Sequence, residues 1–252
     1  MPSYDFSGQR LFVQDDLGPD VTIRLDAAQT NYAVNVLRLK VSDTLLLFNG
    51  RDGEWQGEII AATRKACDVR LVAATRAQTP GPDIDYVFAP LKRARLDYMV
   101  QRVTEMGVAR LVPVLTDRTQ AERVKLERMR ANCIEAAEQC GVLRVPDVVP
   151  PVRFAEWHAA ARQDSGRAVI FCDESADVRD PIAALAAVAP GPIAVVIGPE
   201  GGFSAAERTA LIGLGHATQI ALGPRIMRAD TAAVAALALV NAVIGDWRQQ
   251  AV

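Results

Sequence analysis

Two glycine-bearing segments near the C-terminus constrain the fold of this chain most strongly. Residues 197–204 read Ile-Gly-Pro-Glu-Gly-Gly-Phe-Ser, and residues 222–231 read Leu-Gly-Pro-Arg-Ile-Met-Arg-Ala-Asp-Thr. Each segment follows a short apolar run typical of a buried strand and leads into a helical pattern. Open α/β sheets bind ligands beyond the carboxyl ends of their strands. We therefore expect both segments to lie at one edge of a parallel sheet and to form a ligand site there.

Strand and helix patterns alternate from residue 84 onwards. The predicted strands are 84–89, 110–114, 145–148, 168–172, 193–197 and 218–222, and the predicted helices are 94–106, 122–140, 155–163, 181–187, 205–214 and 232–246. Asp230 and Thr231 stand where the N-cap of the last helix is expected. Such alternation predicts an α/β fold, with a parallel sheet covered by helices on both faces.

The first 75 residues have a different pattern, rich in short strands. Strands are predicted at 11–13, 21–25, 44–48, 55–60 and 68–72, with a turn at 49–53 and one helix from Asp26 to about Leu37. Residues 76–83 contain two prolines and a glycine, which are incompatible with a helix or a central strand. We therefore expect a compact β-barrel over 1–75, a linker over 76–83 and an α/β domain over 84–252.

Composition excludes several classes of protein. No run of the 252 residues is long and apolar enough to span a membrane, and Met1–Asp5 lack the features of a signal peptide. Four scattered cysteines and two histidines make a zinc site improbable. We expect a cytoplasmic protein without a metal.

Charge is unevenly distributed, although the net charge is only −2. Residues 91–130 contain ten Lys and Arg against five Asp and Glu. This stretch is compatible with a solvated helix face of mixed charge or with a surface that binds phosphates.

The two loops contain the candidate chemistry. Gly201 and Gly202 allow the backbone to approach a ligand closely, and Ser204 with Glu207 has the spacing of a helix capping box. The first loop matches neither the Walker A nor the Gly-x-Gly-x-x-Gly pattern. Glu200 is either a carboxylate that holds the loop or a general base or hydrogen-bond acceptor. Arginines of the second loop suit phosphate or a developing oxyanion, with surface salt bridges as the alternative.

In combination, five segments of the chain resemble the bacterial RsmE family of 16S rRNA uridine-N3 methyltransferases, which belongs to the SPOUT class. The resemblance covers nearly the whole chain and rests on Arg10–Val13 with Tyr32–Arg38, Lys92–Gly107, Glu138–Cys140, Ile197–Ser204 and Leu222–Thr231. The chain departs from the family at residues 229–231, where Ala-Asp-Thr replaces the more usual Thr-Glu-Thr.

The resemblance implies the fold and the partners. It implies a trefoil-knotted SPOUT α/β domain after a PUA-like β-barrel that binds RNA, and a homodimer with its site near the interface. The implied cofactor is S-adenosylmethionine, and the implied substrate is a uridine in the decoding region of 16S rRNA in the 30S subunit. The residues implied to bind the cofactor are Ile197, Gly198, Pro199, Glu200, Gly201, Gly202, Leu222, Gly223, Ile226 and Met227.

Roles in catalysis and RNA binding follow from the same resemblance. Arg225 or Arg228 would stabilise negative charge on the uracil, and Glu200 or Asp230 would accept the N3 proton. The residues expected to contact RNA are Arg10, Arg38, Lys92, Arg93, Arg118 and Arg144. Two alternatives remain open: a ribose 2′-O-methyltransferase that uses the same loops, and a non-catalytic RNA-binding assembly factor.

Overall fold

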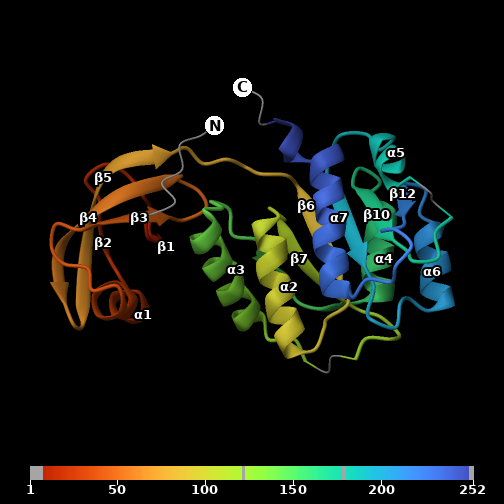
Figure 1. Cartoon of the computed structure of the whole chain (residues 1–252), viewed down its shortest axis with the longest axis horizontal. Helices are drawn as coiled ribbons and strands as arrows, with labels where there is room; N and C mark the ends of the chain where they lie inside the picture. The colour runs from red at the N-terminus through yellow and green to blue at the C-terminus, as the bar shows by residue number, and fades with distance from the viewer. Residues whose placement is uncertain (1–7, 121–122, 178–179, 250–252) are drawn as a thin grey trace. The chain divides into compact units, whose positions relative to one another are not determined.

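The computed structural model describes residues 8–120, 123–177 and 180–249 (Figure 1). Met1–Asp5 and Glu122, which enter the expectations above, lie outside these ranges. Contacts between residues divide the chain into two compact units: residues 1–80 with 137–145, and residues 81–136 with 146–252. The segment 137–145 therefore packs with the N-terminal unit, although it lies within the stretch expected to form the α/β domain.

The first unit is built on a five-stranded sheet with the strand order β1-β3-β4-β5-β2. Its elements are β1 (Arg10–Phe12), β2 (Thr22–Arg24), α1 (Ala27–Thr30), a π-helical turn η1 (Asn31–Val36), β3 (Thr44–Phe48), β4 (Glu54–Thr63) and β5 (Ala66–Arg76). β1 is parallel to β3, and the other neighbours are antiparallel. Register shifts along β4 and β5 bend the sheet. Asp26 caps α1 as expected, accepting a hydrogen bond from the backbone N–H of Gln29.

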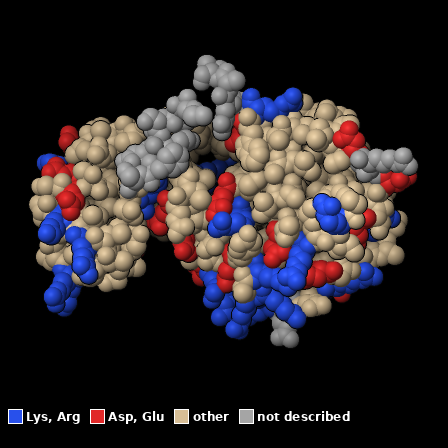
Figure 2. Space-filling view, viewed as in Figure 1, with Lys and Arg blue, Asp and Glu red and all other residues tan. Residues whose placement is uncertain are grey.

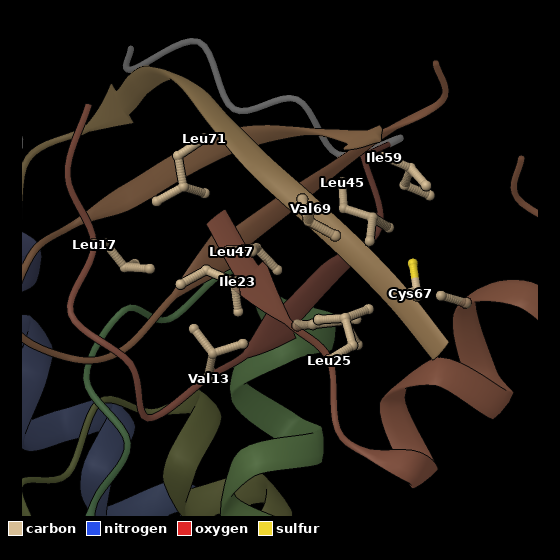
Figure 3. Packing of buried hydrophobic residues seen from close by; sticks show 12 residues of the cluster. Val13, Leu17, Ile23, Leu25, Leu45, Leu47, Ile59, Cys67, Val69 and Leu71 are labelled. Atoms are coloured by element: carbon tan, nitrogen blue, oxygen red, sulfur yellow. The ribbon is translucent and has the colours of Figure 1, made fainter. Parts of the chain in front are cut away.

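Alternate residues of these strands form the core of the first unit (Figure 3). Leu45 and Leu47 of β3 point into the same interior as Val69 and Leu71 of β5, and each is at most 1% exposed. This spacing follows from strand geometry, because side chains two residues apart share a face. Complete burial of an aliphatic side chain contributes about 1.5–3 kcal/mol, so this cluster is a main source of the unit's stability.

The second unit contains a parallel sheet of seven strands, in the order β12-β10-β11-β6-β7-β8, with β9 paired to β7. Its strands are β6 (Ile84–Phe88), β7 (Arg110–Leu115), β8 (Asp147–Val148), β9 (Val152–Arg153), β10 (Ala168–Cys172), β11 (Ile193–Ile197) and β12 (Ala217–Ile220). Its helices are α2 (Arg93–Glu105), α3 (Leu126–Cys140), α4 (Phe154–Gln163), α5 (Pro181–Ala186), α6 (Ala205–Ile212), α7 (Ala229–Val243) and the 3-10 helix η2 (Asp246–Gln249). The expected α/β class is confirmed.

Helices cover both faces of this sheet (Figure 1). Val87 and Val196 face α4 and α6 in one apolar cluster that includes Trp157 and Leu211. Tyr86, the neighbour of Val87 in β6, points to the opposite face, where its hydroxyl lies 3.3 Å from the sulfur of Met99 in α2. On that face α7 packs against α2, α5 and β11.

The end of α3 belongs to the first unit through specific contacts. Ala137 and Leu143 pack with Phe48 of β3, and the carboxylate of Glu138 accepts a hydrogen bond of 2.9 Å from the backbone N–H of Phe12. The segment Glu138–Cys140 thus ties the helix end to the N-terminal sheet.

The C-terminal segment returns from the edge of the sheet towards its middle. β12 is an edge strand, whereas the helix that follows it packs against β11. This return path agrees with the expected knotted class. The helix begins at Ala229, three residues earlier than predicted, and Arg228 is its N-cap. Asp230 and Thr231 therefore lie in its first turn and not at the cap. No helix within the described ranges is long and apolar enough to cross a membrane.

Candidate functional site

A pocket lies at the carboxyl ends of β10, β11 and β12 in the second unit. It is formed by the segments that follow these strands and by the first turns of α7. The lining residues are Cys172, Asp173, Glu174, Ile197, Gly198, Pro199, Glu200, Gly201, Gly202, Phe203, Leu222, Gly223, Arg225, Ile226, Met227, Ala229 and Ala232. The structure thus brings together every residue expected to bind a cofactor, at the sheet edge that the sequence indicated.

Close approaches of the backbone give the first loop its shape. A Cβ atom on Gly198 would lie 2.9 Å from the ring of Phe203. Gly202 has φ +69°, and a Cβ there would lie 2.9 Å from the Glu174 carboxylate. The N–H of Gly202 donates to the carbonyl of Pro199 at 2.8 Å, which closes the turn. The left-handed φ of Gly202 therefore favours glycine, and a side chain at Gly198 would require the Phe203 ring to move.

Glu207 holds the end of this loop. Ser204 and Glu207 form the expected capping box at the start of α6, in which the Ser204 N–H donates to the Glu207 carboxylate at 2.9 Å. The other oxygen of Glu207 accepts the N–H of Asp117 at 2.8 Å. Glu207 is only 5% exposed. One buried carboxylate therefore joins the loop after β11 to the segment after β7.

Two arginines from neighbouring elements contact the middle of the loop. The Arg118 guanidinium donates to the carbonyl of Gly201 at 2.6 Å, and Arg95 forms an ion pair of 3.1 Å with Glu200. Arg118 is exposed and braces the loop through this hydrogen bond; its expected contact with RNA stays a prediction. The sequence placed Arg95 in the basic stretch 91–130 but could not predict its ion pair, because the partner lies 105 residues away in the chain.

The second loop presents its side chains to solvent. Arg225 and Arg228 are exposed, and Ile226 is 91% exposed. Arg225 lines the pocket, whereas Arg228 is not among the lining residues described above. Asp230, in the first turn of α7, is half-buried and accepts the N–H of Thr231 at 2.9 Å. Of the four candidate catalytic residues, the structure brings Glu200 and Arg225 to the pocket itself.

The segment after β10 contributes residues that sequence reasoning missed. Asp173 is buried, and its carboxylate accepts hydrogen bonds from Arg208 at 2.8 Å and Gln219 at 3.2 Å. Glu174 extends towards Gly202. Burial raises the pKa of the Cys172 thiol to about 12, so this thiol stays protonated at neutral pH and is a poor nucleophile. Two carboxylates directly after a predicted strand were the signal that could have identified this part of the pocket.

A basic groove lies beside the pocket. We define it by its lining residues Leu91, Lys92, Arg93, Ala94, Arg95, Gln120, Arg123 and Glu200. Figure 2 shows Lys and Arg side chains gathered where the N-terminal end of α2 lies in Figure 1. The lining contains four cations and one carboxylate, so it favours anions. Lys92 and Arg93, both expected to contact RNA, lie in it, and Glu200 lines both the groove and the pocket.

The other expected RNA contacts belong to the first unit. Arg10 is buried, with its side chain 4% exposed, and its guanidinium pairs with Glu54 at 2.9 Å. This residue does not offer its charge to a ligand in solution, which corrects the expectation. Arg38 is exposed, and Arg144 is half-buried and donates to the carbonyl of Pro80 at 2.7 Å. Within the described residues, no group of three or more His, Cys, Asp or Glu could hold a metal ion.

Comparisons with known proteins identify the family. A family model described as an RNA methyltransferase domain matches residues 78–241, and one described as an RNA methyltransferase PUA domain matches residues 25–72. The chain is 28% identical over 234 residues to the ribosomal RNA small subunit methyltransferase E of Rickettsia conorii, covering 92% of this chain and 94% of the relative.

Solved structures share the fold. A Legionella pneumophila protein in complex with the cofactor SAM has a TM-score of 0.82 at 27% identity, covering 93% of this chain and 97% of that one. The ribosomal RNA small subunit methyltransferase E of Neisseria gonorrhoeae has a TM-score of 0.80 at 24% identity, and the match covers 95% of this chain and 99% of that one. The resemblance inferred from the sequence is confirmed. Because the first family model matches more than half of this chain, the chain belongs to the RNA methyltransferase family that this domain defines.

Proposed function

We propose that this chain transfers the methyl group of S-adenosylmethionine to N3 of a uridine in the 16S rRNA of the small ribosomal subunit. The observation that carries the proposal is the pocket formed by the two loops at the carboxyl ends of β11 and β12. The name of the Rickettsia conorii relative supports small-subunit rRNA as the substrate, and the SAM complex of the Legionella pneumophila protein supports the cofactor.

The pocket fits this cofactor by its chemistry. Gly198 and Gly202 line the pocket without a Cβ atom, which suits close contact between backbone and ligand. The carboxylates of Glu174 and Glu200 complement a cationic ligand. We assign the backbone of Leu222, Gly223 and Met227 to the adenine, and that of Ile197, Gly198 and Gly202 to the ribose and methionine; Pro199, Gly201 and Ile226 complete the lining.

Four residues of the chain are proposed to act on the uracil. When bound, the cofactor supplies an electrophilic methyl group. Loss of the N3 proton leaves negative charge shared with O2 and O4, which the guanidinium of Arg225 or Arg228 would stabilise. Glu200 or Asp230 would accept the proton. Glu200 fits this role better, since it lines both the pocket and the groove. The pairing edge of the base must be exposed, so the uridine must be unpaired or extruded.

The basic groove would hold the RNA through its phosphates. Phosphate contacts position a nucleic acid without reading its sequence, and Lys92, Arg93 and Arg123 are all exposed in the groove. Arg38 of the first unit is a further proposed contact.

Since the proposed substrate of the protein is ribosomal RNA, we place the protein in the cytoplasm. We keep residues 1–75 and 84–252 as the two domains; the two family matches lie on either side of residue 75.

We also propose a homodimer. Apolar residues of α7 that are only half-buried support it, because such residues leave an apolar strip for a second copy to cover. The members of this α7 strip are Val234, Ala235, Ala238 and Leu239.

The test uses small subunits from a strain that lacks the gene, incubated with purified protein and methyl-labelled S-adenosylmethionine. Digestion of the rRNA and mass spectrometry of its nucleosides should identify 3-methyluridine. A ribose-methylated nucleoside would identify a 2′-O-methyltransferase instead. Absence of label, together with intact RNA binding, would identify a non-catalytic RNA-binding factor.

A further inference from the structure

The ion pair between Arg95 and Glu200 lies where the basic groove meets the pocket. Glu200 lines both, and Arg95 lines the groove. Their side chains are 41% and 36% exposed, and the closest nitrogen and oxygen are 3.1 Å apart. An ion pair this exposed is weak, because water and salt screen it. A stronger anion that enters the groove can therefore take Arg95 from its partner.

The position of the cations indicates a role in binding and not in stabilising the helix. Arg93 and Arg95 lie at the start of α2, where the helix macrodipole favours negative charge, and the first turn contains no acidic residue. Lys92, the N-cap residue, makes no capping hydrogen bond through its side chain. Cations at this end do not stabilise the helix, but they are well placed to bind the phosphates of an RNA strand.

We propose that Arg95 exchanges partners when RNA binds. Without RNA it holds Glu200; with RNA it binds a backbone phosphate in the groove and leaves the Glu200 carboxylate free at the junction with the pocket. The exchange rests on the proposed function, since it requires an RNA strand in this groove. Phosphate is the stronger partner because a guanidinium can bind two of its oxygens through parallel hydrogen bonds.

The exchange links RNA binding to the state of the candidate proton acceptor. Arg95 is a positioning residue in this scheme, since it acts through Glu200. Any free energy that holds Arg95 on Glu200 opposes RNA binding, and by linkage RNA opposes the ion pair to the same extent. Removing the carboxylate should therefore strengthen RNA binding, and this gain should depend on Arg95.

The test is a double-mutant cycle on the binding of a short fluorescent single-stranded oligouridylate, followed by anisotropy. Glu200→Gln should bind it about two- to fivefold more tightly than the wild type, which corresponds to the usual strength of an exposed ion pair. Arg95→Ala should bind more weakly, and the gain from Glu200→Gln should be smaller in that background, because only the repulsion between the carboxylate and the RNA is then removed.

Arg93→Ala is the matched control, because Arg93 lines the same groove while Arg95 makes the ion pair with Glu200. It should weaken binding, but Glu200→Gln should still strengthen it in that background. An equal gain in the Arg95→Ala background would overturn the proposal, since it would reflect only the loss of a negative charge. No gain in the wild-type background would also overturn it. A wild-type protein that binds no RNA and methylates no subunit would instead contradict the proposed function.

Discussion

Gly202 is the residue of the first loop whose backbone conformation most strongly favours glycine. Alanine there would take a left-handed conformation at a cost of about 1–2 kcal/mol, and its Cβ would meet the Glu174 carboxylate. If the loop shifts to relieve this, we expect Gly202→Ala to weaken S-adenosylmethionine binding about tenfold, as measured by calorimetry. Gly201→Ala is the control, because a Cβ there would make ordinary contact with Arg118 at 3.5 Å. Equal affinities of the two variants would contradict the account.

Glu54 makes the stability of the first unit depend on pH. Burial raises the pKa of its carboxyl, but hydrogen bonds from Arg76, Thr75 and Arg10 outweigh burial and hold the pKa below the ordinary 4.5. A depressed pKa stabilises the fold above the unfolded value, and this stabilisation is lost as pH falls through the folded value. The wild type should therefore lose stability below about pH 4.5.

Glu54→Gln tests the direction of this pH dependence of stability. It should cost about 3–5 kcal/mol at pH 7, because two arginines lose a buried partner, and its unfolding free energy should change less between pH 5 and pH 3. Urea unfolding at pH 7, pH 5 and pH 3 measures both the loss of stability and its pH dependence. Identical pH dependence in the two proteins would show that Glu54 is not the group responsible.

Several single residues could be assigned from the sequence and others could not. Ser204 with Glu207 was predicted correctly, because capping chemistry is local. The burial of Arg10 was missed, since it depends on Glu54, 44 residues away. The contact of Arg118 with the Gly201 carbonyl was also missed, because a sequence shows the charge of an arginine but not a partner 83 residues away.

At the scale of elements, the junction between α6 and the first loop depends on Glu207. Glu207→Ala leaves the N–H groups of Ser204 and Asp117 without their acceptor, at a cost of about 2 kcal/mol, and should also weaken cofactor binding. Ser204→Ala removes only the capping hydroxyl and should cost about 1 kcal/mol. Thermal unfolding compares the two variants. A larger loss of stability in Ser204→Ala than in Glu207→Ala would show that the link to Asp117 is unimportant.

The elements themselves were largely predictable, because apolar periodicity and turn residues act locally. Their ends were less so: α3 begins at Leu126, and α7 spans Ala229–Val243 where 232–246 was expected. β9 was missed, because its two residues directly follow Pro150 and Pro151 and form no apolar run. Strand order could not be predicted from any one segment, since the place of β11 between β6 and β10 is set by long-range packing.

At the scale of the whole molecule, the α7 strip makes the oligomeric state testable. Leu239→Arg places a charge in this strip and should convert the proposed dimer to a monomer, measured by light scattering after size-exclusion chromatography. Ile212→Arg is the control, because Ile212 is 44% exposed on α6, which covers the other face of the sheet. The proposal fails if Leu239→Arg keeps the wild-type mass or if the wild type is itself a monomer.

The central claim is that the loops after β10, β11 and β12 form the binding pocket for the methyl donor. A crystal structure of the protein grown with S-adenosylhomocysteine, the demethylated product, tests it most directly. We predict density for the adenine against the backbone of Leu222–Met227 and for the ribose beside Gly198 and Gly202. Ordered ligand at another place on the chain, or none at saturating concentration, would contradict the account.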